Sequence, residues 1–281
     1  MATNIFIPEV FSDAVNEKLG TTLRFGSVAF DASSLCPEIA TAGDIVHFPK
    51  IKRTANVESV VKGTALTPSV VDMSDSTATI KYVGSAFRIY DSEKAQIKGS
   101  VQDQIVQQVV DAMSKKIDSD LASSIDADVV YKSAVASATG ITSAEIQTGM
   151  DNFGDSVDTA SYAAIIINSR LRSDFMNMSE FVDTARTYQT SNNGIVINGV
   201  IGYYYGVPVI VTNNGTWDDT AKECKSYIVK RDALGYIFQK NISIEESRQA
   251  LLLATDVVAS SLYATKLIDD TGVVLLRKSI A

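Results

Sequence analysis

Residues 43–91 read GDIVHFPKIKRTANVESVVKGTALTPSVVDMSDSTATIKYVGSAFRIYD, and this stretch decides the fold. Its two ends, Asp44–Pro49 and Ser76–Tyr90, are rich in β-branched and aromatic residues, and both are predicted to be strands. The connection between them is far longer than the loops that usually join strands in a compact domain. We therefore expect a two-stranded hairpin that protrudes from the body of the protein.

The tip of this hairpin has two interpretations. It is either a solvated surface insertion or a segment that another molecule covers. The tip carries too many apolar side chains for a solvated loop, which favours the second interpretation. The residues expected at this contact are Val57, Val60, Val61, Lys62, Leu66, Val70 and Val71.

On the N-terminal side of the hairpin, Ile7–Leu19 predicts a short amphipathic helix. Its apolar residues fall near helical spacing, Pro8 suits the first turn, and Gly20 is expected to end the helix. The following residues, 23–42, have a mixed, loop-like composition. We expect the helix to form an arm.

On the C-terminal side, Ser92–Ile125 has the strongest helical pattern in the chain. Ser92 is a suitable N-cap and no proline interrupts the segment. Apolar residues recur at every fourth position, so the stripe winds around the helix. These residues are Ile97, Val101, Ile105, Val109, Met113, Ile117 and Leu121. Such a helix suits a strut that touches several elements in turn.

Residues 126–221 predict a separate α/β lobe. Thr142 and Glu145 have the spacing of a capping box for a helix that reaches about Phe153. The continuous apolar run Tyr162–Asn168 is typical of a buried strand. Further elements are expected at Ser169–Met178 (helix) and at Gly194–Gly199 and Gly206–Thr212 (strands), around the triplet Tyr203, Tyr204 and Tyr205.

The last sixty residues return to strand patterns. The expected strands are Ser226–Lys230, Leu234–Gln239, Ile242–Arg248, Asp256–Leu267 and Gly272–Lys278. Turn residues at Asp269–Gly272 predict that Ala259–Lys266 and Val273–Leu276 pair as a hairpin.

Composition narrows the functional classes. The 281 residues carry 25 basic and 33 acidic side chains, a net charge of −8. No basic stripe is visible, so direct binding of DNA is not expected. No apolar run is long enough to span a membrane, and the N-terminus lacks the features of a secretory signal, so we expect a cytosolic product. Cys36 and Cys224 are far apart in sequence and are expected to be free thiols.

The sequence offers little for chemistry. His47 is the single histidine, which argues against zinc hydrolysis and histidine-based triads. The stretch GIVINGVIG does not match a phosphate-binding loop. Acidic pairs occur at Asp118/Asp120, Asp126/Asp128, Asp218/Asp219 and Asp269/Asp270, where solvated helix ends or turns explain them. We expect no catalytic residue, no cofactor and no metal site, and we expect the tyrosine triplet to pack against a neighbour.

The order of these elements and several short sequence motifs resemble those of one known family. Near the start stands IPEVFSDAV, the hairpin opens with GDIVHFPKI, its tip reads KGTALTPS, and it closes with TATIKYVGSAFRIYD. The long helix ends in KKIDSDLASSI, the lobe contains IIINSRLRSDF, and the chain closes with ATDVVASSLYATKLIDDTGVVLLRKS. Taken in this order, they are similar to the major capsid proteins of tailed bacteriophages, which have the Hong Kong 97-like α+β fold.

The resemblance implies a division of the chain. Residues 1–42 become the N-terminal arm and its connection, and residues 43–91 the E-loop hairpin that lies across a neighbouring subunit. Residues 92–133 hold the spine helix of the peripheral (P) domain, residues 134–221 the axial (A) domain, and residues 222–281 the terminal strands of the P-domain. Tyr203, Tyr204 and Tyr205 are then expected to contact other copies at the axis of a hexamer or pentamer.

The resemblance also implies partners. Copies of the chain are expected to assemble into hexamers and pentamers, in the host cytoplasm, and to close an icosahedral head around double-stranded DNA without sequence-specific binding. The arm begins close to Met1, so we expect a separate scaffolding protein, and a portal. Two alternatives stay open at this point. One is an encapsulin-type nanocompartment shell, and the other is an enzyme with a site in the lobe that joins the acidic pairs to the tyrosines.

Overall fold

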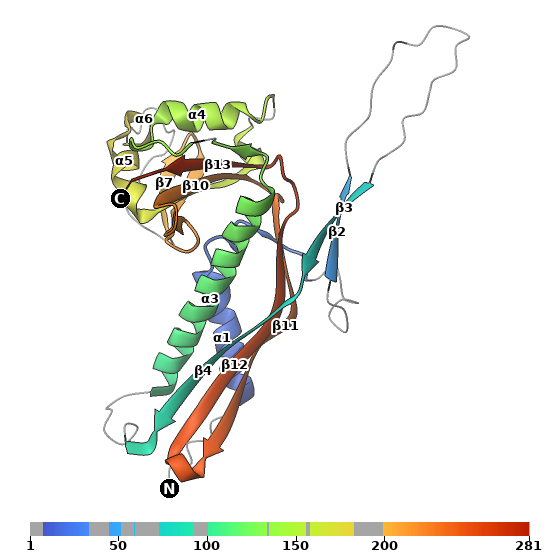
Figure 1. Ribbon diagram of the computed structural model, residues 1–281, viewed down its shortest axis with the longest axis vertical. Helices are drawn as coiled ribbons and strands as arrows, with labels where there is room; N and C mark the ends of the chain where they lie inside the picture. Colours follow the sequence, from blue (N-terminus) through green and yellow to red (C-terminus); the bar gives the residue numbers. More distant parts are fainter. Residues whose placement is uncertain are drawn as a thin grey trace, which may run out of the picture.

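The computed structural model describes residues 8–33, 45–51, 59, 73–92, 101–133, 135–155, 158–182 and 199–280 (Figure 1). They form three parts: an elongated strut, a lobe at one end of it, and a narrow hairpin that projects sideways. The predicted strand over Gly194–Gly199 falls mostly outside the described residues.

The strut consists of two helices packed along a four-stranded sheet with the order β1-β11-β12-β4. Its helices are α1 (Pro8–Thr22) and α3 (Val101–Asp128), and its strands are β1 (Phe30–Asp31), β4 (Lys81–Tyr90), β11 (Leu234–Gln249) and β12 (Ala254–Leu267), with the 3-10 helix η3 (Ala250–Leu252) between β11 and β12. Contrary to the prediction, α1 continues past Gly20, and the two strands expected between Leu234 and Arg248 form one strand with irregular register.

The long helix is confirmed over its described part. Its 28 residues make a rod of about 42 Å at 1.5 Å per residue. It ends at Asp128, beyond the predicted Ile125, and residues 93–100 of the predicted helix lie outside the described set. The apolar stripe is buried against α1 and the sheet, as its spacing predicts, at Ile105, Val109, Met113, Ile117 and Leu121.

The lobe is built on a seven-stranded sheet with the order β5-β13-β10-β6-β8-β7, in which β9 also pairs with β10. The strands are β5 (Tyr131–Lys132), β6 (Tyr162–Ile167), β7 (Val200–Tyr204), β8 (Val207–Val211), β9 (Trp217–Asp218), β10 (Glu223–Lys230) and β13 (Val273–Lys278). The helical segments are α4 (Ser143–Asp151), η1 (Thr159–Ser161), η2 (Ser169–Leu171), α5 (Arg172–Asn177) and α6 (Ser179–Val182).

Two local predictions for the lobe are confirmed. Thr142 and Glu145 form the capping box at the start of α4, with the Thr142 N–H donating to the Glu145 carboxylate at 2.9 Å. The apolar run beginning at Tyr162 is strand β6, which lies inside the sheet between β10 and β8. A strand covered on both faces needs apolar residues at every position, which explains the continuous run.

The projecting hairpin pairs β2 (Ile45–Ile51) with β3 (Met73–Thr79). The prediction of one strand over Ser76–Tyr90 is wrong, because the strand is divided at Ile80 into β3 and β4. The first half pairs with β2, while β4 pairs with β12 in the strut. The inward-facing positions change phase at this division, from Ala78 and Ile80 to Val83 and Ser85, and both Lys81 and Tyr82 are exposed. β-Branched and aromatic residues nevertheless run across it, so composition alone does not reveal the change of partner.

The predicted hairpin between Ala259–Lys266 and Val273–Leu276 is also wrong. Strand β12 pairs with β11 and β4, whereas β13 pairs with β10 and β5. The turn at Asp269–Gly272 therefore leads from one sheet into the other. Turn residues define a change of direction but not which strands become partners. As a result the lobe sheet crosses the expected boundary at residue 221, since β10 and β13 complete it.

Candidate assembly surfaces

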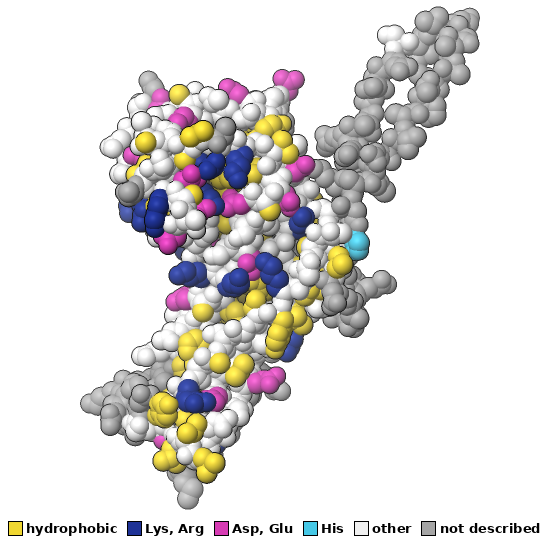
Figure 2. Space-filling view, in the orientation of Figure 1, with side chains coloured by type: hydrophobic (Ala, Val, Ile, Leu, Met, Phe, Trp, Pro, Cys, Tyr) yellow, Lys and Arg dark blue, Asp and Glu magenta, His cyan; other side chains and the backbone are white. Residues whose placement is uncertain are grey.

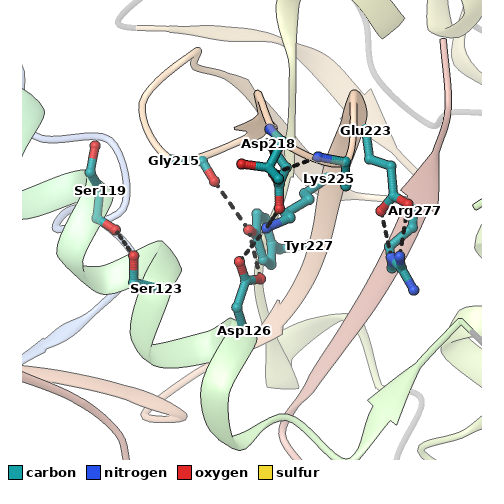
Figure 3. A network of polar contacts seen from close by, with 11 residues as sticks. Ser119, Ser123, Asp126, Gly215, Asp218, Glu223, Lys225, Tyr227 and Arg277 are labelled. Carbon is teal, nitrogen blue, oxygen red and sulfur yellow. Dashed lines mark hydrogen bonds and ion pairs between the residues drawn. The ribbon is translucent and has the colours of Figure 1, made fainter.

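The lobe is fixed to the strut by a network of polar contacts at the C-terminal end of α3 (Figure 3). The Asp126 carboxylate accepts hydrogen bonds from Lys225 at 2.6 Å and from the Tyr227 hydroxyl at 3.2 Å. Lys225 also pairs with Asp218 at 3.2 Å. Burial, and next the negative charge of Asp126, raise the pKa of the Tyr227 hydroxyl well above its ordinary value. Tyr227 therefore stays protonated and acts as a structural link between β10 and α3.

A second link is made by Asp118, about two turns before Asp126 on α3. Its side chain is 0% exposed and accepts the backbone N–H groups of Arg24, Phe25 and Gly26 at 3.0–3.3 Å. It also accepts the side-chain N–H of Asn214 from the lobe at 3.3 Å. The sequence interpretation of Asp118 as part of a solvated helix end is therefore wrong. This carboxylate joins the turn after α1, the long helix and the lobe.

Gly215 also belongs to this junction, because here the backbone of the lobe lies very close to α3. A Cβ atom on Gly215 would lie 2.4 Å from the Cβ of Ala122, and the backbone has a φ of +68°. Both observations require glycine at this position. The Gly215 carbonyl also accepts the Tyr227 hydroxyl at 3.2 Å. The lobe backbone thus rests directly on α3, and the angle between lobe and strut is set by buried contacts.

The tyrosine triplet lies at the turn between β7 and β8. Tyr205 and Gly206 have φ values of 47° and 82° and form a two-residue turn of the type with positive φ at both positions. Tyr204 is 0% exposed, and its hydroxyl contacts Ser143 at 2.7 Å. A side chain without exposed surface is not available to a second copy. The proposed axial contact is therefore narrowed to Tyr203 and Tyr205, which are 36% and 43% exposed.

The opposite end of the molecule carries an apolar tip that the sequence interpretation missed. It consists of Leu251, Leu252 and Leu253 between β11 and β12, which are 101%, 51% and 65% exposed. Figure 2 shows apolar side chains gathered at this end of the strut. Leu253 has a φ of 49°, a backbone conformation that favours glycine or asparagine. Three leucines in a turn between two strand patterns are the signal that could have found this tip.

The tip is held in place by an ion pair at its base. Arg248 on β11 makes a two-pronged contact with Asp91 at 2.6 and 2.8 Å, which connects the end of β11 to the end of β4. The exposed leucines thus follow directly after a part of the sheet whose strand ends are joined by this ion pair.

The acidic pairs have structural roles. Asp120 accepts the Tyr263 hydroxyl at 2.7 Å and pairs with Lys81 and Lys116 at 3.1 Å. The other side-chain contacts are Asp126–Lys225, Asp128–Lys266, Asp218–Lys225, Asp219–Lys222 and Asp269–Thr271, while the backbone carbonyl of Asp270 accepts the Val130 N–H at 3.2 Å. Among the described residues, no group of three His, Cys, Asp or Glu side chains is arranged to hold a metal ion.

A cavity of about 420 Å³ lies between α4 and β13. It is lined partly by Glu145 and Lys278, which form an ion pair in which Lys278 is 2% exposed. Neither the acidic pairs nor the tyrosine triplet lines this cavity. This cavity therefore does not join those groups in the way that the enzyme alternative requires.

Several expectations fall outside the described residues. These expectations concern Cys36 and the residues at the hairpin tip, which are Val57, Val60, Val61, Lys62, Leu66, Val70 and Val71. Cys224 is buried as a free thiol. No helix in the described ranges has the length and apolar character to cross a membrane.

Comparison with solved structures shows the same fold in phage shells. A chain of Mycobacterium phage Che8 superposes with a TM-score of 0.66 at 15% identity, over 90% of each chain. The capsid of cyanophage P-SCSP1u has a TM-score of 0.66 at 13% identity, with 92% of this chain and 89% of that chain covered. The capsid of cyanophage Pam1 has a TM-score of 0.62 at 12% identity, with coverage of 93% and 91%. The predicted Hong Kong 97-like α+β fold is confirmed.

A search of curated protein sequences gave no match. The sequence profile of a phage capsid protein family, however, matches residues 74–276, which is well over half of the chain. The match begins at β3 and runs through the strut and the lobe to β13. The chain therefore belongs to the phage capsid protein family.

Proposed function

We propose that this chain is the major subunit of a tailed-phage head, whose copies form hexamers and pentamers and close an icosahedral shell around double-stranded DNA. The observation that carries the proposal is that both ends of the subunit, the lobe and the far end of the strut, expose apolar or aromatic side chains. Tyr203 and Tyr205 stand at the lobe end, and Leu251–Leu253 stand at the strut end. Apolar residues in exposed turns do not stabilise an isolated subunit, but they stabilise contacts between subunits.

Each part of the molecule is proposed to have its own position and contacts in the shell. The lobe is proposed as the A-domain, with Tyr203 and Tyr205 at the axis of each capsomer. The strut is proposed as the P-domain, and the hairpin of residues 43–91 as the E-loop that lies on a neighbouring copy. Because the lobe sheet includes β10 and β13, we assign these two strands to the A-domain.

The charge of the chain supports enclosure of DNA without tight binding. The net charge is −8, and a protein that grips phosphates needs a surplus of cations on its contact face. A separate scaffolding protein and a portal are proposed partners. Genes for a terminase and a portal beside the coding gene would support a phage head, whereas a peroxidase or ferritin-like gene would support a nanocompartment.

The direct test compares the full chain with a variant in which Val57–Val71 is replaced by a short Gly/Ser linker. We expect the full chain to form capsomers or closed shells by light scattering and electron microscopy, with or without a scaffolding protein. We expect the variant to keep its circular dichroism spectrum and to remain unassembled, since the hairpin tip is proposed to act between copies. A full chain that stays monomeric under all these conditions would contradict the proposal. Unfolding of the variant would show that the tip belongs to the subunit core.

A further inference from the structure

The two edges of the strut sheet differ in a way that points to a binding surface. One edge is β1, which has two residues. The other edge is β4, which has ten residues, KYVGSAFRIY, and contains no proline. Its register with β12 is continuous from Lys81 to Tyr90, without a bulge. Proteins usually shorten, bend or cover an edge strand, because a long straight edge pairs with other chains.

The register shows which backbone groups β4 turns outward. The N–H of Asp91 donates to the carbonyl of Leu253 at 3.0 Å, so these two residues form a hydrogen-bonded pair. Such pairs alternate along an antiparallel ladder, so every second residue of β4 bonds to β12. The residues between them direct their N–H and C=O groups away from β12, and they are Tyr82, Gly84, Ala86, Arg88 and Tyr90. Within the described part of the chain, these outward groups have no backbone partner.

The side chains beside this edge are also incompletely covered. Val83, Phe87 and Ile89 face the core of the strut, yet each is only half-buried. An added strand would place its own side chains next to them and complete their burial. The two charges of β4 are already neutralised, because Lys81 pairs with Asp120 at 3.1 Å and Arg88 with Asp256 at 2.6 Å. The edge therefore offers main-chain groups and apolar surface, which suits a polypeptide strand and not a nucleic acid.

We propose that the outer edge of β4 accepts an extended segment from a second copy of this chain by strand addition. The inference rests on the proposed shell function. The described part of each subunit presents one such edge, so a shell needs one strand per subunit to fill all of them. Another copy of the chain supplies a strand in this ratio. The contact joins two different surfaces, which is the kind of contact that builds rings of subunits. The incoming segment is expected to lack proline and to have small or apolar side chains at alternate positions.

Hydrogen exchange on the unmodified chain tests this proposal. We expect the amides of Tyr82, Gly84, Ala86, Arg88 and Tyr90 to exchange rapidly in the isolated subunit and to be protected in shells made from the purified chain. The alternate amides of β4, which bond to β12, are the internal control and should be protected in both states. Shells in which the outward amides still exchange rapidly would overturn the inference but leave the shell function intact. Failure to form any shell would count against the proposed function itself.

Two further outcomes also overturn the inference. If the outward amides are already protected in the isolated subunit, another segment of the same chain covers the edge. If protection appears only when a scaffolding protein is present, that protein is the occupant.

A matched pair of variants provides a second test. Ala86→Pro removes one outward N–H, and proline is tolerated on an edge strand where the N–H faces solvent. Ala86→Thr keeps the N–H and has a side chain suited to a strand. We expect both subunits to fold, but only Ala86→Pro to raise the concentration needed for assembly, by roughly tenfold or more. Equal assembly of the two folded variants would contradict the proposal. If the proline variant is unstable, the exchange measurement on the unmodified chain decides.

Discussion

Strands β6 and β4 show that the lobe and the strut differ in how completely their strands are buried and paired. Five of the six side chains of β6 are buried, and neighbouring strands occupy both of its edges. None of the side chains of β4 is buried, and one edge has no neighbour in the described part of the chain. The lobe therefore contains its stabilising contacts within one subunit. The strut presents an open strand edge, which we propose is covered when subunits meet.

The largest expected effect tests this contrast with two truncations. Phe175 in the lobe is 0% exposed and packs edge-to-face on Phe181, with 5.9 Å between ring centroids. Phe175→Ala should lower the free energy of unfolding by about 3–5 kcal/mol through lost burial and a cavity. Leu251→Ala at the strut tip should change it by no more than about 0.5 kcal/mol. Urea unfolding of both variants measures the difference, and similar losses would refute the contrast.

The junction between the two parts gives the next effect. Gly215→Ala should destabilise the subunit by about 2–3 kcal/mol, because the new Cβ meets Ala122 and the φ is positive. Gly154→Ala is the matched control, since its φ is also positive, at +59°, but its surroundings are open. It should cost about 1 kcal/mol. Thermal unfolding separates contact from backbone strain, and equal losses would mean that the lobe does not rest tightly on α3.

The smallest effect concerns pH, where the two carboxylates on α3 should act in opposite directions. Burial alone would raise the pKa of Asp120, but hydrogen bonds from Tyr263, Lys116 and Lys81 outweigh burial and lower it below 3.8. Its stabilisation is therefore present above that pH and is lost as the pH falls through the lowered pKa. Burial raises the pKa of Asp118 above 3.8, although its N–H donors offset part of the rise. Its contribution is full below that pH and declines as the pH rises through the raised pKa.

Unfolding free energies of the Asn variants at a series of pH values check these signs. Asp120→Asn should be less stable than the parent chain by about 1–2 kcal/mol near neutral pH, because charged hydrogen bonds are lost. This difference should shrink in acid. The stability of the parent relative to Asp118→Asn should instead improve as the pH falls. Parallel pH profiles for the two variants would contradict the assignment.

The sequence predicted those elements that local patterns determine. The stripe from Ile105 to Leu121 predicted the buried face of α3, and Thr142 with Glu145 predicted the start of α4. The wrong prediction of a β12–β13 hairpin has a different origin, because strand pairing depends on partners that are distant in sequence. The role of Asp118 was missed for the same reason, since its donors, Arg24 to Gly26 and Asn214, meet only in the folded chain.

The site could be predicted only in part. The tyrosine triplet was expected to pack against a neighbouring copy, and this stays a prediction for Tyr203 and Tyr205. Tyr204 cannot take part, because the alternation of a strand end sends its side chain inward. The leucines at 251–253 fall between the predicted strands Ile242–Arg248 and Asp256–Leu267 and were given no role, because an apolar run carries no information on whether its side chains face the core or the solvent. Exposure at a turn is decided by the long-range pairing of β11 with β12.

Because the junction fixes the angle between the lobe and the strut, a small change of that angle produces a large displacement at the far end of the strut. A tilt of about 5° at Gly215 would move the far end of a rod of about 42 Å by about 4 Å, more than a hydrogen bond tolerates. In the proposed shell every subunit carries this junction, so a change in its angle would recur in every copy. We therefore expect the absence of a side chain at residue 215 and the buried carboxylate at residue 118 to influence the curvature of the proposed shell.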